Sequence, residues 1–142
     1  MAADELLELH FPVQGGDFTQ AGEASSKIKR TLQQIGIAPA LIRRSAIAAY
    51  EAEMNIVIHA YQGVLQLTIW PGYIELVASD SGPGIADLEL AMQEGYSTAP
   101  GIAREMGFGA GMGLPNMQRN ADELEVQSQV GVGTTVRIRI SL

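Results

Sequence analysis

The 142-residue chain contains no cysteine, few aromatic side chains and no long apolar run. The absence of cysteine excludes a disulfide scaffold, a thiol nucleophile and a zinc site built on cysteines. No apolar stretch reaches the ~18–20 residues that a membrane span needs. The acidic start, with Asp4, Glu5 and Glu8, is unlike a signal peptide, which is basic and then apolar. The composition therefore predicts a cytoplasmic protein with no membrane partner.

Basic side chains are also scarce, with 9 Lys and Arg against 16 Asp and Glu, which gives a net charge of −7. This balance argues against a nucleic-acid partner, which would require a basic face. Within residues 23–44, however, five bases accompany one acid, Glu23; the bases are Lys27, Lys29, Arg30, Arg43 and Arg44. This local basic face could dock an acidic protein partner, and a solvated helix surface is the alternative.

The length predicts one domain over residues 1–142, and the chain shows no repeat or linker. Alternating apolar residues predict strands over 6–14, 64–70, 73–79, 124–130 and 134–140. Helices are predicted over 18–35, 39–60, 86–95 and 115–123, and the second should be largely buried. This order predicts an α/β fold: a two-layer sandwich with a mixed, mostly antiparallel sheet and helices on one face.

Three polar side chains recur along the apolar helix predicted over 39–60. Glu51, Asn55 and His59 are spaced four residues apart, so they share one helix face. A carboxylate can act as a general base, and an amide oxygen is a suitable ligand for Mg²⁺. A polar helix edge with a satisfied core histidine is the alternative explanation.

Two glycine-rich segments follow. In the segment 80–85 (DSGPGI), Asp80 could accept a hydrogen bond from an exocyclic amine while the glycines admit a flat ring; an ordinary turn is the alternative. In the segment 107–115 (GFGAGMGLP), alternating glycines before a helix could expose backbone N–H groups to phosphates. No Lys-Ser/Thr pair follows these glycines, so the segment is not a Walker A loop. A loop without a function remains the alternative.

The order of these motifs resembles that of the Bergerat-fold (GHKL) ATPases, the superfamily of gyrase, Hsp90, histidine kinases and MutL. EAEMN resembles their N box, DSGPGI and GAGMGL their two glycine boxes, and Gly133-Thr134 their closing Gly-Thr. The resemblance extends from about residue 8 to 141. The short chain and the ExxxNxxxHA pattern over 51–60 resemble the stand-alone serine/threonine kinases of bacterial partner switching, of the RsbW, SpoIIAB and RsbT type. The chain departs from them in a longer lid insert, 99–108, and in the lack of a basic residue at 109–110, for which Arg104 could substitute.

This resemblance implies ATP or ADP binding with Mg²⁺ and transfer of phosphate to a Ser or Thr of a small antagonist protein. It also implies a sigma factor or phosphatase as a further partner, and it allows a homodimer. Glu51 would be the catalytic base, Asn55 the Mg²⁺ ligand, and Asp80 the adenine acceptor, supported by Thr134 through water. The other implied nucleotide-binding residues are His59, Gly82, Gly84, Ile85, Arg104, Gly109, Ala110, Gly111, Met112, Gly113 and Leu114. A nucleotide-gated binding module with little catalysis and the catalytic domain of a histidine kinase are the alternatives.

Overall fold

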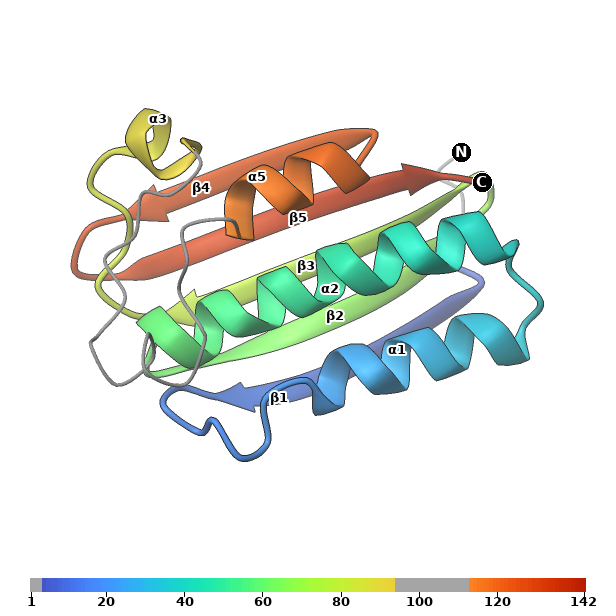
Figure 1. The fold of residues 1–142 in the computed structure, drawn as a ribbon, viewed down its shortest axis with the longest axis horizontal. Helices are drawn as coiled ribbons and strands as arrows, with labels where there is room; N and C mark the ends of the chain where they lie inside the picture. The colour runs from blue at the N-terminus through green and yellow to red at the C-terminus, as the bar shows by residue number, and fades with distance from the viewer. Residues whose placement is uncertain (1–3, 94–112) are drawn as a thin grey trace.

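A computed structural model of the chain describes residues 4–93 and 113–142. Its helices α1, α2 and α5 cover one face of a five-stranded sheet (Figure 1). The strands are β1 (Leu7–Gln14), β2 (Gln62–Trp70), β3 (Tyr73–Ser81), β4 (Glu123–Gln129) and β5 (Gly133–Ser141). The helices are α1 (Glu23–Gln34), α2 (Pro39–His59), α3 (Leu88–Ala91) and α5 (Gly113–Asn120). The predicted α/β two-layer sandwich is confirmed.

The sheet has the strand order β1-β2-β3-β5-β4, and each of these neighbouring pairs is antiparallel, so the described sheet is antiparallel rather than mixed as predicted. Successive side chains of a strand point to opposite faces, so the alternating sequence gives the sheet one apolar face. On β2 that face carries Leu65, Leu67 and Ile69, all buried under the helices. The β2–β3 hairpin turns at Pro71 and Gly72, where Gly72 has φ +98°, which favours glycine.

Helix α2 is the central helix of the helical layer and contacts α1, α5 and the sheet. Its alanines at 48, 49 and 52 are completely buried. Small side chains let neighbouring backbones approach closely, and α2 therefore packs on several sides at once. The prediction that this helix is largely buried is confirmed.

Three predicted helix boundaries are wrong. The first helix begins at Glu23 rather than at 18, because Gly22, with φ +95°, closes a turn before it. The last helix runs over 113–120 rather than 115–123. Proline is tolerated in a first helical turn, so the helix begins before Pro115, and it ends early because β4 starts at Glu123.

The helix predicted over 86–95 is also shorter in the described part. Helix α3 covers only 88–91, and the Asp87 carboxylate accepts the Leu90 N–H at 3.1 Å to cap it. The end of that predicted helix lies outside the described residues. No helix within residues 4–93 and 113–142 combines the length and apolar character needed to cross a membrane.

Candidate functional site

Glu51 and Asn55 lie one turn apart on α2, and both face the first turn of α5. A Cβ placed on Gly113 would lie 3.3 Å from Asn55 Oδ1 and 3.5 Å from Glu51 Oε2. Both side chains are half-buried. The predicted polar stripe thus brings a carboxylate oxygen and an amide oxygen to the first residue of a helix. The N-terminus of a helix carries partial positive charge and N–H groups that lack partners within the helix.

Asn116, on α5, holds the other oxygen of Glu51. Its Nδ2 donates to Glu51 Oε1 at 3.2 Å across 65 residues of sequence. This residue was not among the predicted site residues. The available signal was a polar side chain directly after Pro115, in the first turn of a predicted helix.

His59 is the last residue of α2 and is half-buried. Burial lowers the pKa of its imidazole, because the charged form loses hydration. The side chain is therefore neutral at pH 7. His59 is the last of the three polar residues along the helix. The next residue, Ala60, packs against Gly82 in the segment after β3.

Asp80 lies near the end of β3, on the helix-covered face that also carries Leu76 and Ala78. Its Oδ1 accepts the backbone N–H of Thr134, on β5, at 3.1 Å. Burial raises the pKa of this carboxyl group, and the hydrogen bond from Thr134 opposes that shift. The structure therefore joins two residues that the sequence places 54 positions apart.

The glycines around Asp80 leave room for the protein's own backbone. A Cβ on Gly82 would lie 2.9 Å from Ala60 Cα, and one on Gly84 would lie 2.5 Å from the carbonyl oxygen of Gln129. Gly84 also has φ +76°, which favours glycine. A Cβ on Gly133 would lie 2.0 Å from the Asp80 carbonyl oxygen. These contacts fix the segment after β3 against the end of α2 and the β4–β5 turn.

Ser128, on β4, completes this end of the site. Its hydroxyl accepts the Ile85 N–H at 2.7 Å, donates to the Gly133 carbonyl at 3.2 Å and lies 2.8 Å from Thr134 Oγ1. Ile85 is half-buried, and the hydrogen bond from its N–H to Ser128 attaches it to β4. Ser128 was missed, although it interrupts the inward apolar alternation of its strand.

Glu53 was not predicted as a functional residue either, and its side chain contacts α1 rather than α5. Its side chain is 2% exposed. Its carboxylate accepts N–H groups at the start of α1: Gly22 at 3.0 Å, Ala24 at 3.2 Å and Ser25 at 2.9 Å. The available signal was a charged residue among apolar neighbours, Ala52 and Met54, in a helix predicted to be largely buried.

Several predicted residues cannot be placed. Those outside the described residues are Arg104, Gly109, Ala110, Gly111 and Met112, together with the predicted lid insert over 99–108. Leu114 is described and its side chain is buried in the core, so any ligand contact there would use its backbone. Among the described residues, no group of three or more His, Asp or Glu side chains could hold a metal ion.

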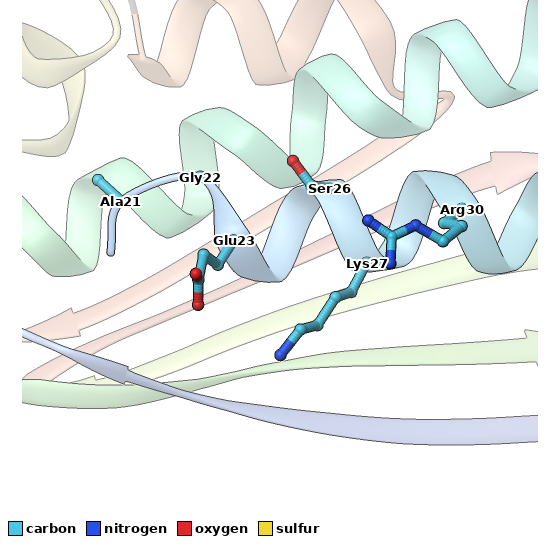
Figure 2. Close-up of a pocket in the computed structure, with 6 residues that line it drawn as sticks. All are labelled: Ala21, Gly22, Glu23, Ser26, Lys27 and Arg30. Atoms are coloured by element: carbon cyan, nitrogen blue, oxygen red, sulfur yellow. The ribbon is translucent and has the colours of Figure 1, made fainter. Parts of the chain in front are cut away.

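The predicted basic face is divided between two places. A hollow of about 300 Å³ lies at the start of α1, and it is lined by Ala21, Gly22, Glu23, Ser26, Lys27 and Arg30 (Figure 2). Lys27, Lys29 and Arg30 are exposed along this helix. Arg44 is engaged elsewhere, because it donates to the Asn120 carbonyl at 3.1 Å and to Asp122 at 3.2 Å.

The comparisons with known proteins identify the ATPase family that the order of the motifs resembles. Residues 16–140 match the histidine kinase-like ATPase domain family. An anti-sigma F factor of Halalkalibacterium halodurans is 38% identical over 95 residues, which are 63% of this chain and 62% of that protein. An anti-sigma F factor of Caldanaerobacter subterraneus subsp. tengcongensis is 41% identical over 96 residues, 64% of each chain. The chain thus spans less than two thirds of the length of these curated relatives.

A solved structure shows the same fold. A chain in the crystal structure of the SiaB–SiaC complex from Pseudomonas aeruginosa aligns with a TM-score of 0.61 at 15% identity, covering 96% of this chain and 89% of that one. The family match extends from the turn after β1 to the end of β5, and the site described above lies within it. Membership of an ATPase-domain family implies binding of ATP or ADP. The chain belongs to the histidine kinase-like ATPase domain family.

Proposed function

We propose that the chain is an ATP-dependent serine/threonine protein kinase of a bacterial partner-switching pathway and phosphorylates a small antagonist protein. The observation that carries the proposal is the convergence of Glu51 Oε2 and Asn55 Oδ1 on Gly113, at the start of α5. Phosphoryl transfer depends mainly on positioning and charge neutralisation, so few side chains suffice. The name of the curated relatives, anti-sigma F factor, supports the pathway.

At the other end of the site, Asp80 binds the adenine amino group. Its Oδ1 is already held by the Thr134 N–H, so the carboxylate is oriented before the nucleotide arrives. Thr134 supports the base through water with its hydroxyl. The backbone around Gly82, Gly84 and Ile85 forms the wall of the adenine pocket, and His59 lines it as a neutral side chain.

A Mg²⁺ ion fits the oxygen donor of Asn55, because amide and carboxylate oxygens are its usual protein ligands. Mg²⁺ usually keeps several waters and takes its remaining ligands from substrate phosphates. A site with Asn55 as its main protein ligand therefore agrees with the lack of a larger acidic cluster in the described part of the chain. The bound ion would neutralise phosphate charge.

In the transfer step, Glu51 accepts the proton of the attacking Ser or Thr hydroxyl. The hydroxyl oxygen forms a bond to the γ-phosphorus as the bond from that phosphorus to the bridging oxygen breaks. ADP leaves with the electron pair of that bond. Backbone N–H groups at the start of α5, at Gly113 and Leu114, stabilise the phosphate charge.

The nucleotide site is tested by calorimetric titration with ATP, with and without Mg²⁺. Asp80→Asn keeps an oxygen for the Thr134 N–H but replaces the second acceptor by a donor. We expect affinity to fall by about 10- to 100-fold or more, as for the loss of a charged hydrogen bond. Asp87→Asn is the matched control, since asparagine caps α3 as well as aspartate does. Equal affinity of Asp80→Asn and the parent chain would remove the adenine role.

The kinase reaction is tested with labelled ATP and a candidate antagonist domain that offers a Ser or Thr. The parent chain should leave acid-stable phosphate on the domain, and Glu51→Ala should bind ATP but lose transfer. A fully active Glu51→Ala variant would exclude Glu51 as the base. Nucleotide-dependent capture without transfer would instead identify a binding module, and acid-labile phosphate on a helical hairpin would identify a histidine-kinase domain.

We also propose that an acidic surface of the protein partner docks on α1, because the exposed Lys27 and Arg30 line the hollow in Figure 2 and Lys29 is exposed on the same helix. Complementary charge raises association rates and makes them sensitive to salt. Lys27→Glu with Arg30→Glu should slow association with the partner and weaken its salt dependence. Arg43→Glu, an exposed charge reversal on α2 at a residue that does not line the hollow, is the control. Equal rates for all variants would mean that these bases form a solvated surface.

A further inference from the structure

Asn116 lies on α5 and faces the proposed base, Glu51, on α2. The residue is half-buried, and its side chain reaches from α5 to α2. Nδ2 donates to Glu51 Oε1 at 3.2 Å, and Oδ1 accepts from Arg119 Nη1 at 3.1 Å. A guanidinium only donates and a carboxylate only accepts, so these two neighbours fix which end of the amide faces which side.

The two oxygens of Glu51 therefore have different surroundings. Oε1 is held by Asn116, whereas Oε2 faces Gly113 beside Asn55. Glu has three rotatable side-chain bonds, and a carboxylate tethered through one oxygen keeps the other in one place. A reacting group must be held within about 0.5 Å of its productive position.

We propose that Asn116 is a positioning residue, which holds Glu51 through Oε1 so that Oε2 receives the proton of the attacking group. The amide is neutral, so it orients the carboxylate without cancelling the negative charge that a base needs. Because Asn116 and Gly113 belong to the same helix, the base and the phosphate-binding turn move together. The inference rests on the proposed function of Glu51.

The test is a double-mutant cycle with Mg²⁺–ATP as the probe, read as single-turnover ADP formation and as calorimetric affinity. Here water attacks the γ-phosphorus, its proton passes to Glu51, and ADP leaves. Asn116→Asp keeps the shape and the acceptor for Arg119 but places an oxygen against Glu51 Oε1. We expect the rate constant to fall by about 10- to 100-fold with little change in ATP affinity. Gln118→Glu, the same amide-to-acid change at an exposed position of α5, should leave both unchanged.

In a Glu51→Ala background, Asn116→Asp should cause no further loss, because a positioning residue acts only through its partner. A merely structural role would instead lower the rate equally in both backgrounds, and that result would overturn the inference. So would an Asn116→Asp variant as fast as the parent while Glu51→Ala is slow.

A second readout needs no turnover. The Asn116 side-chain NH₂ resonances should shift in Glu51→Gln and stay in place in Glu89→Gln, an exposed change on α3. Unshifted resonances in Glu51→Gln would mean that the hydrogen bond is absent and would overturn the inference alone. A parent chain that binds no ATP would contradict the proposed function, and the inference would fall with it.

Discussion

Replacing the buried Glu53 by glutamine tests how α1 is attached to α2. The carboxylate is 2% exposed and accepts three backbone N–H groups between 2.9 and 3.2 Å. Two of them share Oε2 and the third, from Ser25, uses Oε1. A glutamine can keep its oxygen toward the pair, but its NH₂ then faces the Ser25 N–H, and donor meets donor.

The expected loss follows from those contacts. A hydrogen bond to a charged group contributes about 1.5–3 kcal/mol, against about 0.5–1.5 kcal/mol for a neutral one. Glu53→Gln loses the Ser25 bond and the charge on the other two, so we expect the free energy of unfolding to fall by about 3 kcal/mol. That is a large share of the roughly 5–15 kcal/mol that stabilises a typical domain.

The assay is urea denaturation followed by circular dichroism, with Glu51→Gln as the matched control. Glu51 lies two residues away on the same helix but accepts only one described hydrogen bond, at a half-buried position. Its substitution should therefore change stability by about 1 kcal/mol or less. If Glu53→Gln lowers the free energy of unfolding no more than Glu51→Gln does, the capping argument is wrong.

Three further predictions follow from the site. Gly133→Ala should unfold the chain or displace Asp80, since the new Cβ would lie 2.0 Å from the Asp80 carbonyl oxygen. Gly131→Ala, whose Cβ would have nothing within 4 Å, should lower the free energy of unfolding by only about 1 kcal/mol, through backbone strain, in the same denaturation assay. Because burial raises the Asp80 pKa, ATP affinity should fall on acidification at a higher pH than an ordinary aspartate would require; calorimetry across pH checks this, and a pH-independent affinity would contradict it. Because the pKa of His59 is lowered in the folded chain, the unfolded chain binds a proton at this side chain more readily on acidification. The free energy of unfolding should therefore fall as pH drops through about 6.5. His59→Gln should reduce that pH dependence in denaturation measured across pH.

Local signals predicted the parts of the fold that depend on neighbours in sequence. Alternation gave the strands, and Pro71-Gly72 marked the β2–β3 turn where the structure has it. The four-residue spacing of Glu51 and Asn55 was enough to place them on one helix face, because it follows from helix geometry alone. Both then face α5 in the structure.

Contacts between distant segments were beyond such signals. The bond from Asn116 to Glu51 spans 65 residues, and the cap that Glu53 provides to α1 spans about 30. The start of α1 was misplaced for the same reason. Apolar spacing continues back to Phe18, but the residue that satisfies the first N–H groups comes from α2, so the helix begins where Glu53 reaches it.

Glu51 and Glu53 show how one helix can serve two sites. Successive residues of an α-helix are rotated by about 100°, so side chains two positions apart point in nearly opposite directions. Glu51 consequently faces α5 and the proposed phosphate site, while Glu53 faces the start of α1. The alanines at 48, 49 and 52 of the same helix are completely buried, and they have no flexible side chains. A partner that shifts the start of α1 must therefore either break the Glu53 bonds or move α2, and only the second route would displace Glu51 from Gly113.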